Sequence, residues 1–225
     1  MPREQFQREL NELRDLLLRM GGLVETAVQH SLHAVLDREP ALAAAVTREL
    51  EPEINRAELE VGERALRLMA LQQPLAVDLR FVAAALKISN DLERMGDLAV
   101  NIAQGAERLL RQPLAPPLVD LPLMAERANQ MLRSALDALV PGDAGLARQV
   151  LAGDDEVDHM RDEIFERLTR AIVSQPSQVE ANLGMMFIAR NLERIADHAT
   201  NIAEDVIFWL EGVDVRHHSA PPPVP

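Results

Sequence analysis

Two stretches of the chain carry acidic and amide side chains at helical spacing. In the first stretch Glu93 and Asp97 stand four residues apart, and Asn101 follows after four more. The same pattern returns 100 residues later with Glu193, Asp197 and Asn201. Side chains at this spacing lie on one helix face, about one turn apart. Two carboxylates placed in this way repel each other unless a cation binds them or one of them keeps its proton.

The first acidic pair is expected to face further oxygen ligands on the preceding helix. Gln73-Pro74 predicts a short turn, and a short connection makes the two neighbouring helices antiparallel. Residues whose numbers sum to about 148 should then lie side by side. In this register Glu93 faces Asn55 and Asp97 faces Glu51, and these two partners are themselves four residues apart.

The second acidic pair has equivalent partners. Gln175-Pro176 predicts the corresponding turn, so partner numbers sum to about 351. Glu193 then faces Asp158, and Asp197 faces Asp154. This half offers four carboxylates, whereas the first half offers three carboxylates and an Asn. Because cation affinity at oxygen sites rises with ligand charge, we expect the tighter metal site in the second half.

Clusters of hard oxygen ligands indicate a hard cation. Mg²⁺, Mn²⁺ and iron fit such ligands best, and Zn²⁺ and Ca²⁺ are alternatives. His198, next to Asp197, is placed to add a nitrogen ligand. The competing interpretation is a solvated surface on which Arg94 and Arg194 form ion pairs with the carboxylates. The duplication of the pattern and the opposed second pair favour the metal.

The composition indicates helices as the elements that hold these residues. Apolar residues make up 48% of the 225 residues and aromatic residues only 3%, with no Tyr. Ala, Leu, Arg and Glu dominate, which favours helix over sheet. Apolar residues recur every three or four positions between Pro- and Gly-containing breaks. The expected helices span about 1–37, 41–72, 75–112, 120–140, 143–174 and 177–211.

A tandem duplication organises these helices. Residues 90–103 and 190–203 are identical at eight of 14 positions. Four prolines, beginning with Pro113 and ending with Pro122, separate the two copies and predict a linker. We therefore predict an all-α fold made of two antiparallel three-helix bundles. The expected domains are 1–112 and 118–211, followed by a disordered tail at 212–225.

The net charge and the absence of certain motifs exclude several classes of function. The net charge of −13 argues against nucleic acid as a direct partner, because such a chain gains nothing from displacing counterions from phosphates. The absence of Cys excludes disulfides and thiolate sites. No apolar run is long enough to span a membrane, and the N-terminal residues lack a signal-peptide core, so we expect a cytoplasmic protein. Phosphate loops and nucleophile elbows are absent.

The residues around the acidic pairs resemble the PhoU family. QPLAVDLR at 73–80 and LERMGD at 92–97 are similar to the family signature in its first repeat. LERIADHATNIAEDV at 192–206 is similar to the signature in the second repeat. The resemblance covers nearly the whole chain up to the tail. Two departures stand out: Asn55 replaces an expected acidic residue, and no D-L-R sequence follows the second turn.

The resemblance implies a fold, a cofactor and a role. PhoU-like proteins are paired three-helix bundles whose acidic motifs bind multinuclear metal clusters, with iron or zinc preferred. The implied role is that of a non-enzymatic, homodimeric adaptor that links the cytoplasmic components of a phosphate ABC transporter to a sensor histidine kinase. In that role it restrains the phosphate-starvation response, and it reaches the membrane only through its partners. The alternatives are a metal-carboxylate helical enzyme, either a hydrolase or a di-iron oxidase, and a generic helical scaffold.

Overall fold

The first half of the chain folds into three long antiparallel helices. The computed structural model describes residues 2–111 and 120–216, and within them it has helices and turns but no strand. The long helices of the first half are α1 (Pro2–Leu36), α3 (Glu51–Gln72) and α4 (Ala76–Leu110). The predicted turn is confirmed: Gln73 ends α3 in the left-handed conformation (φ 46°, ψ 59°), and Pro74 precedes α4.

An irregular segment leads into α3. The short helix α2 (Pro40–Ala45) continues into a π-helical turn, η1 (Val46–Leu50), before α3 begins. Pro52 lies in the first turn of α3. Proline has no N–H to donate and its ring crowds the preceding turn, so the helix widens just before it. This widened turn ends directly before Glu51, the first residue of α3.

The second half repeats this order with one clear break. Its elements are α5 (Leu121–Leu139), α6 (Ala144–Leu151), α7 (Asp154–Ser174), η2 (Pro176–Gln178) and α8 (Val179–Glu211). The continuous helix predicted over 143–174 is wrong, because α6 ends before Gly153 and α7 begins after it. The side chain of Asp143 caps α6 by accepting from the backbone N–H groups of Gly145 and Leu146 at 2.8 and 3.0 Å. The break places Asp154 at the start of α7, as the π turn places Glu51 in the first half.

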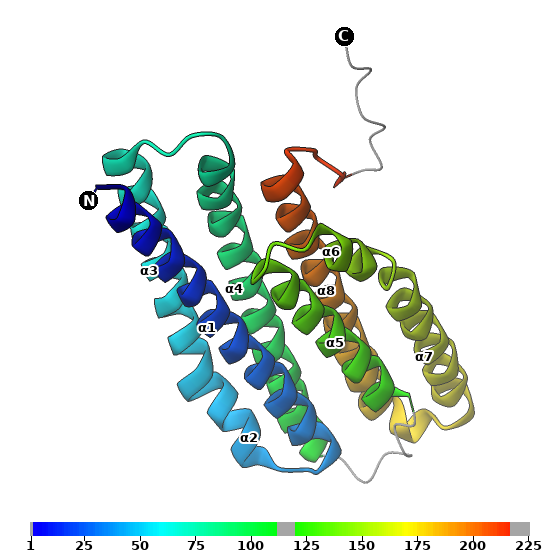
Figure 1. Ribbon diagram of the computed structural model, residues 1–225. Coiled ribbons are helices and arrows are strands. Elements are labelled where there is room, and N and C mark those ends of the chain that lie inside the picture. Colours follow the sequence, from blue (N-terminus) through cyan, green and yellow to red (C-terminus); the bar gives the residue numbers. More distant parts are fainter. Residues whose placement is uncertain (1, 112–119, 217–225) are drawn as a thin grey trace.

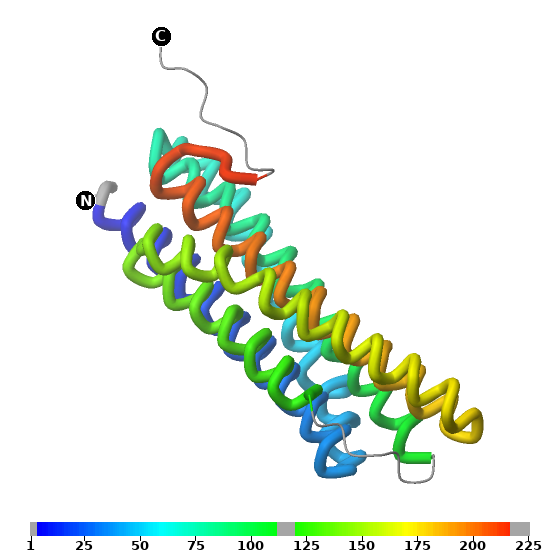
Figure 2. The backbone as a smooth tube through the Cα atoms, turned by 90° about the vertical axis from the view of Figure 1, so that its right-hand side faces the viewer, coloured from blue at the N-terminus to red at the C-terminus, as the bar shows by residue number. Residues whose placement is uncertain are grey.

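The six long helices form two layers. In Figure 1, α3, α4, α8 and α7 lie side by side in one layer, and α1 and α5 form a second layer in front of them. The view in Figure 2 shows that the long helices run nearly parallel or antiparallel to one another. The two halves meet mainly where α4 packs against α8, with a smaller contact between α1 and α5. The all-α fold and the tandem pair of three-helix bundles are thus confirmed.

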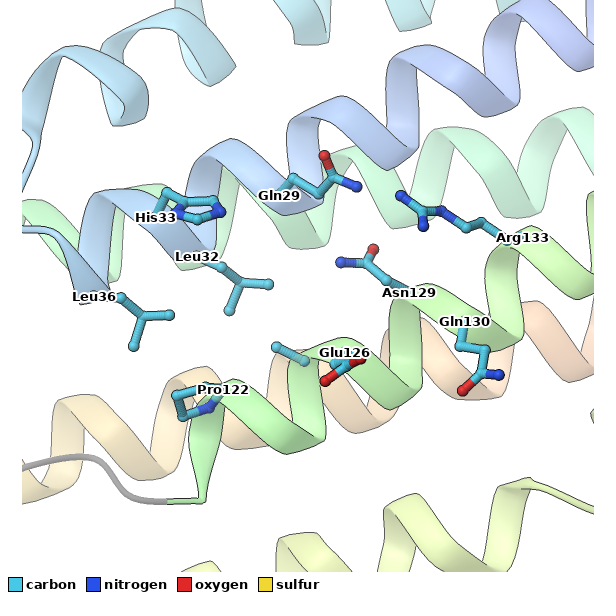
Figure 3. Close-up of a pocket in the computed structure, with 10 residues that line it drawn as sticks. Gln29, Leu32, His33, Leu36, Pro122, Glu126, Asn129, Gln130 and Arg133 are labelled. Carbon is cyan, nitrogen blue, oxygen red and sulfur yellow. The ribbon is translucent and has the colours of Figure 1, made fainter.

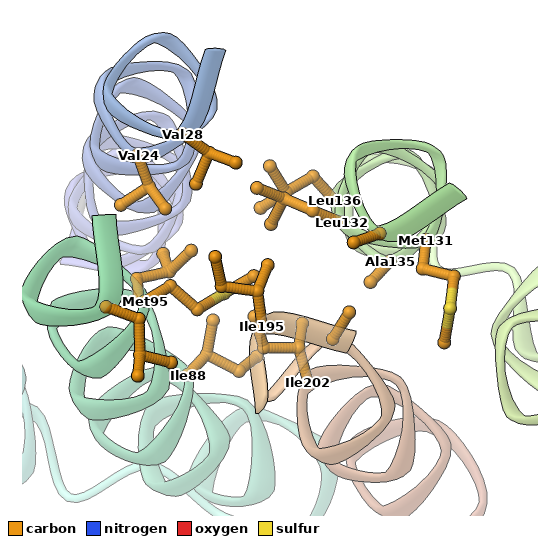
Figure 4. Packing of buried hydrophobic residues seen from close by; sticks show 14 of the residues in the cluster. Val24, Val28, Ile88, Met95, Met131, Leu132, Ala135, Leu136, Ile195 and Ile202 are labelled. Atoms are coloured by element: carbon orange, nitrogen blue, oxygen red, sulfur yellow. The ribbon is translucent and has the colours of Figure 1, made fainter. Parts of the chain in front are cut away.

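One hydrophobic core runs through both halves. Figure 4 shows side chains of α1 and α4 meeting those of α5 and α8, and Val24, Met95 and Ile195 among them are fully buried. At one end of the core the Phe81 and Trp209 rings pack with centroids 5.0 Å apart, and the guanidinium of Arg14 lies over both. The core is therefore continuous across the two bundles.

The ends of the predicted domains are only partly described. Residues 112–119, which contain most of the predicted linker, and the tail residues 217–225 lie outside the described residues, so the predicted boundaries at 112 and 118 remain predictions. Residues 212–216, which the prediction placed in a disordered tail, lie beside α4 and α8, and Val215 packs against the core. Within residues 2–111 and 120–216, no helix combines the length and apolar character that a membrane crossing demands.

Candidate metal centre

The first acidic cluster lies between the start of α3 and the middle of α4. Its members are Glu51, Glu58, Glu93 and Asp97. All four side chains are partly buried, and they flank the core contact where Gly96 packs against Ile54. Burial and then the charge of Asp97 raise the pKa of Glu93, with smaller contributions from Glu58 and Glu51. The structure therefore brings together three carboxylates that the sequence predicted and adds Glu58.

The second acidic cluster lies between the start of α7 and the middle of α8. Its members are Asp154, Asp158, Glu193 and Asp197. Burial and then the carboxylates of Glu193, Asp154 and Asp158 raise the pKa of Asp197 to about 6. Burial and then Asp158 also raise the pKa of Asp154. All four carboxylates that the sequence predicted therefore act on one another.

Each cluster has one arginine at its edge. In the first cluster Arg94 lies 3.6 Å from a carboxylate oxygen of Glu93 and 3.8 Å from one of Asp97. In the second cluster Arg161 lies 3.8 Å from Asp158 and 3.9 Å from Glu193. These contacts are long for hydrogen-bonded ion pairs and only partly neutralise the four acids beside them. The solvated-surface interpretation therefore accounts for only part of the charge.

The number of carboxylates does not support the expectation that the second half binds metal more tightly. That expectation assumed three carboxylates in the first half, but Glu58 is a fourth. The corresponding position in the second half, seven residues after Asp154, is Arg161, just as Glu58 stands seven residues after Glu51. Each half thus offers four carboxylates and one nearby arginine, so charge no longer favours the second site.

The amide and imidazole candidates have other partners. Asn55 donates a hydrogen bond to Oε1 of Glu51 at 2.7 Å, so it holds a carboxylate of the first cluster. Asn201 donates to Oδ1 of Asp91 at 3.2 Å, and Nδ1 of His198 lies 2.7 Å from the same oxygen. Both side chains of α8 thus contact α4 across the junction of the two halves. Asn101, at the equivalent position on α4, is partly buried.

The donor set fits a hard cation in composition and charge. In the part of the chain that the structure describes, no three Asp, Glu or His side chains converge closely enough to hold a metal ion. Burial and, after it, neighbouring carboxylates nevertheless raise the pKa values of Glu93, Asp154 and Asp197. A bound cation relieves such repulsion, and carboxylate and amide oxygens are suitable ligands for it. The clusters thus provide the ligand chemistry without the converged geometry.

A separate cleft opens between α1 and α5 (Figure 3). Its volume is about 680 Å³, and its walls carry Gln29, His33, Glu126 and Asn129. Arg133 at its edge is paired with Glu25. The lining mixes amides with charges of both signs and includes no member of either acidic cluster, so the cleft is not part of the candidate metal centre.

These features define a class: a duplicated helical bundle with an acidic cluster in each half. The PhoU domain family matches residues 17–106 and again residues 121–206. The two matches cover most of both halves and include every member of the two clusters. The chain belongs to the PhoU family.

Named relatives match the chain over most of its length. A protein of Zymomonas mobilis named "Phosphate-specific transport system accessory protein PhoU homolog" is 41% identical over 92% of this chain and 87% of its own length. A protein of the same name from Deinococcus radiodurans is 33% identical over 93% of this chain and 98% of its own length.

Solved structures agree with the fold. The crystal structure of PhoU from Pseudomonas aeruginosa superposes with a TM-score of 0.89 at 36% identity, over 92% of this chain and all of that one. The phosphate transport system regulatory protein PhoU from Streptococcus pneumoniae superposes with a TM-score of 0.87 at 28% identity, over 93% of this chain and 99% of that one. The resemblance inferred from the sequence motifs is thus confirmed over both repeats.

Proposed function

We propose that this protein is an accessory regulator of a phosphate-specific transport system. Membership of the PhoU family over both repeats carries the proposal, because relatives covering nearly the whole chain bear the name of such an accessory protein. In this role the protein links cytoplasmic components of a phosphate ABC transporter to a sensor histidine kinase. It acts as a cytoplasmic homodimer and restrains the phosphate-starvation response when phosphate is plentiful.

Metal binding is part of the same proposal. The first acidic cluster and Asn55 would hold metal in the first half, and the second acidic cluster would hold it in the second half. Iron or zinc is the preferred metal of these multinuclear clusters, with Mg²⁺ or Mn²⁺ as alternatives. When bound, the metal supplies positive charge that ties α3 to α4 and α7 to α8. Its role is then structural or sensory, and the protein needs no catalytic activity of its own.

A metal-carboxylate enzyme remains the second candidate. The observation that favours it is the pKa of Asp197, which lies near 6 and so suits proton transfer close to neutral pH. A purified, metal-loaded protein that hydrolysed a phosphoester or consumed O₂ with turnover, and lost that activity in Asp197→Asn, would support the enzyme.

The regulatory role is tested by deletion and complementation. Cells lacking the gene should express a phosphate-starvation reporter in high phosphate, and the wild-type gene should restore repression. The double variant Asp97→Asn/Asp197→Asn should restore it poorly if metal binding matters. Asp137→Asn, a change at an exposed position of α5 outside both clusters, serves as the matched control. Unchanged reporter activity in the deletion strain would contradict the regulatory proposal.

A further inference from the structure

A groove lies between the C-terminal end of α4 and the N-terminal end of α8. It encloses about 580 Å³. The apolar side chains Leu109, Leu183 and Phe187 line it, and Leu183 and Phe187 are 53% and 41% exposed. Arg108 and Arg111 stand on its α4 side. It is an exposed apolar surface with a basic edge on a chain whose net charge is −13.

Two glycines, Gly105 and Gly184, line the bottom of the groove. A Cβ on Gly184 would lie 2.9 Å from Leu109, and one on Gly105 would lie 3.4 Å from Ile188. The two helices therefore approach closely beneath the groove, and neither position carries a side chain that could fill it.

Residues 212–216 lie against the other end of the same helix pair, which we call the filled end. Residues 100 positions apart correspond, so Phe187 and Arg108 of the groove match Lys87 and Phe208 at the filled end. Lys87 lies 5.4 Å from the centroid of the Phe208 ring, and Arg108 lies 5.6 Å from that of Phe187. At both ends a cation of α4 thus lies over an aromatic ring of α8.

The two ends differ in a carboxylate. At the filled end Asp205 accepts a hydrogen bond from Nζ of Lys87 at 2.9 Å, and only 8% of its side chain is exposed. The equivalent of Asp205 in the groove is Gly105. Among the described residues neither Arg108 nor Arg111 forms an ion pair with an acid, and Glu180 is the one acid in the lining. The groove thus has two cations on α4, Arg108 and Arg111, and no carboxylate at the position equivalent to Asp205.

The filled end also shows which chain chemistry covers such a surface. Residues 212–216 follow α8 and lie over it, with Gly212 beside Arg80 and Val215 packed on the core. The side chain of Arg216 and, more weakly, Lys87 lower the pKa of Asp214. In this segment Val215 packs on the core, and the neighbouring Asp214 pairs with Arg216.

We propose that the groove between α4 and α8 docks a segment of a partner protein in which apolar side chains are flanked by carboxylates. The apolar side chains would cover Leu183 and Phe187, and the carboxylates would meet Arg108 and Arg111. Arg108 and Arg111 favour an occupant with carboxylates, and repulsion between two chains that each carry a net charge of −13 opposes a second copy. The proposal stands on the groove alone and does not depend on the metal centre or on which transport component is bound.

A displayed library of random 12-residue peptides tests the proposal. The library is selected on the wild-type protein and counterselected on Leu183→Glu, which adds charge at a half-exposed position and leaves the core intact. Enriched peptides should combine apolar residues with an excess of Asp and Glu. In fluorescence polarisation, Leu183→Glu and Arg108→Glu should each weaken their binding by about tenfold or more. Peptides with Lys in place of the acids should recover binding to Arg108→Glu.

Matched controls separate the other outcomes. Leu59→Glu, at an exposed leucine of α3, should bind the peptides like the wild type. The proposal is overturned if no peptide is enriched, if enriched peptides bind Leu183→Glu unchanged, or if they are basic. It is also overturned if the wild-type protein binds anionic vesicles and not peptides, and Leu183→Glu weakens that vesicle binding. Dissociation of a wild-type dimer by Leu183→Glu would assign the groove to a second copy instead. If peptides bind only after residues 112–119 are replaced by Gly and Ser, the chain itself competes for the groove, and the proposal is wrong.

Discussion

Asp197 is the residue at which the charge of the acidic clusters has its clearest effect. Its carboxyl has a pKa of about 6 because burial and three neighbouring carboxylates disfavour its ionised form. In an unfolded chain the same group has a pKa of 3.8. The folded protein therefore binds this proton more tightly, and ionisation of Asp197 costs stability as the pH rises from about 4 to about 6. At pH 7 the whole cost is present.

Asp197→Asn should stabilise the metal-free protein at pH 7. The amide keeps the shape and removes the repelled charge, so we expect a gain of about 1 kcal/mol after allowing for solvent screening. This gain corresponds to a rise in Tm of about 3 °C for a domain of this size. At pH 4, where the carboxyl is protonated, the gain should vanish. The measurement is thermal unfolding of chelator-treated protein at both pH values.

The matched control for this prediction is Asp137→Asn on α5, outside both clusters. It should leave the dependence of Tm on pH unchanged. Equal Tm values for Asp197→Asn and the wild type at pH 7 would mean that the four carboxylates do not repel one another.

Most cluster members, but not their full environment, could be predicted from the sequence. Helical spacing and the turn at Gln73-Pro74 predicted that Glu51 and Glu93 lie in one cluster. The actual pairing is shifted by two residues, since Gly96 packs on Ile54. The shift brings Glu58 toward Glu93, which the turn alone could not predict. The spacing of Glu51, Asn55 and Glu58 by four and three residues was the available signal.

Helix irregularities determine where the acidic pairs stand on α3 and α7. Pro52 is a visible sequence signal for the irregular turn that precedes α3. The break at Gly153 was missed because the apolar pattern continues from Val150 to Val157 across it. A glycine within such a pattern is only a weak signal for a helix end. The break is evident only in the structure, where α6 ends at Leu151 and α7 begins at Asp154.

The junction of α4 and α8 contains an ion pair between a half-exposed Lys87 and a buried Asp205, and its loss should destabilise the fold. Lys87→Met leaves the carboxylate of Asp205 buried without its cation, so we expect a loss of about 2 kcal/mol in the free energy of unfolding. Burial already raises the pKa of Asp205, and Lys87 opposes that rise. The loss should therefore be larger at pH 7 than in mild acid. Urea unfolding of Lys87→Met at the two pH values measures it.

A double variant provides the control for this pair. Lys87→Met/Asp205→Leu removes both charges and should recover most of the lost stability. If the double variant is as unstable as the sum of the single variants, the ion pair is not the source of the effect.

Two adjacent glycines of α1 should respond oppositely to substitution by Ala. A Cβ on Gly21 would lie 2.5 Å from a methyl group of Leu136, so Gly21→Ala should force α5 away and cost about 1–3 kcal/mol. Gly22 has no atom within 4 Å of its added Cβ, so Gly22→Ala should stabilise the helix by up to about 1 kcal/mol. Urea unfolding of the two variants checks the prediction, and unchanged stability of Gly21→Ala would contradict the close packing of α1 on α5.

The whole molecule should unfold as one unit. The core is continuous across α4 and α8, and each half alone would expose the apolar faces that now meet there. We expect one calorimetric transition for the metal-free chain and self-association of an isolated 120–216 fragment in analytical ultracentrifugation. Two separated transitions, or a stable monomeric fragment, would show that the halves fold independently.

The two three-helix bundles were largely predictable from the sequence, but the contacts between α4 and α8 that join them were not. Apolar periodicity and the repeat at 90–103 and 190–203 were sufficient for two three-helix bundles. The pairing of Lys87 with Asp205 and of Asp91 with His198 joins residues more than 100 positions apart. No turn connects α4 to α8 and sets their register, so these contacts emerge only from the packing of the two halves.

Metal content tests the central claim most directly, namely that the two acidic clusters of the duplicated bundle bind metal. Elemental analysis of the purified wild-type protein should find iron or zinc bound in more than one ion per chain. Asp97→Asn and Asp197→Asn should each lose metal from one half, and the double variant should lose nearly all of it, while Asp137→Asn retains the wild-type amount. Wild-type protein that takes up no metal, or a double variant with unchanged metal content, would contradict the claim.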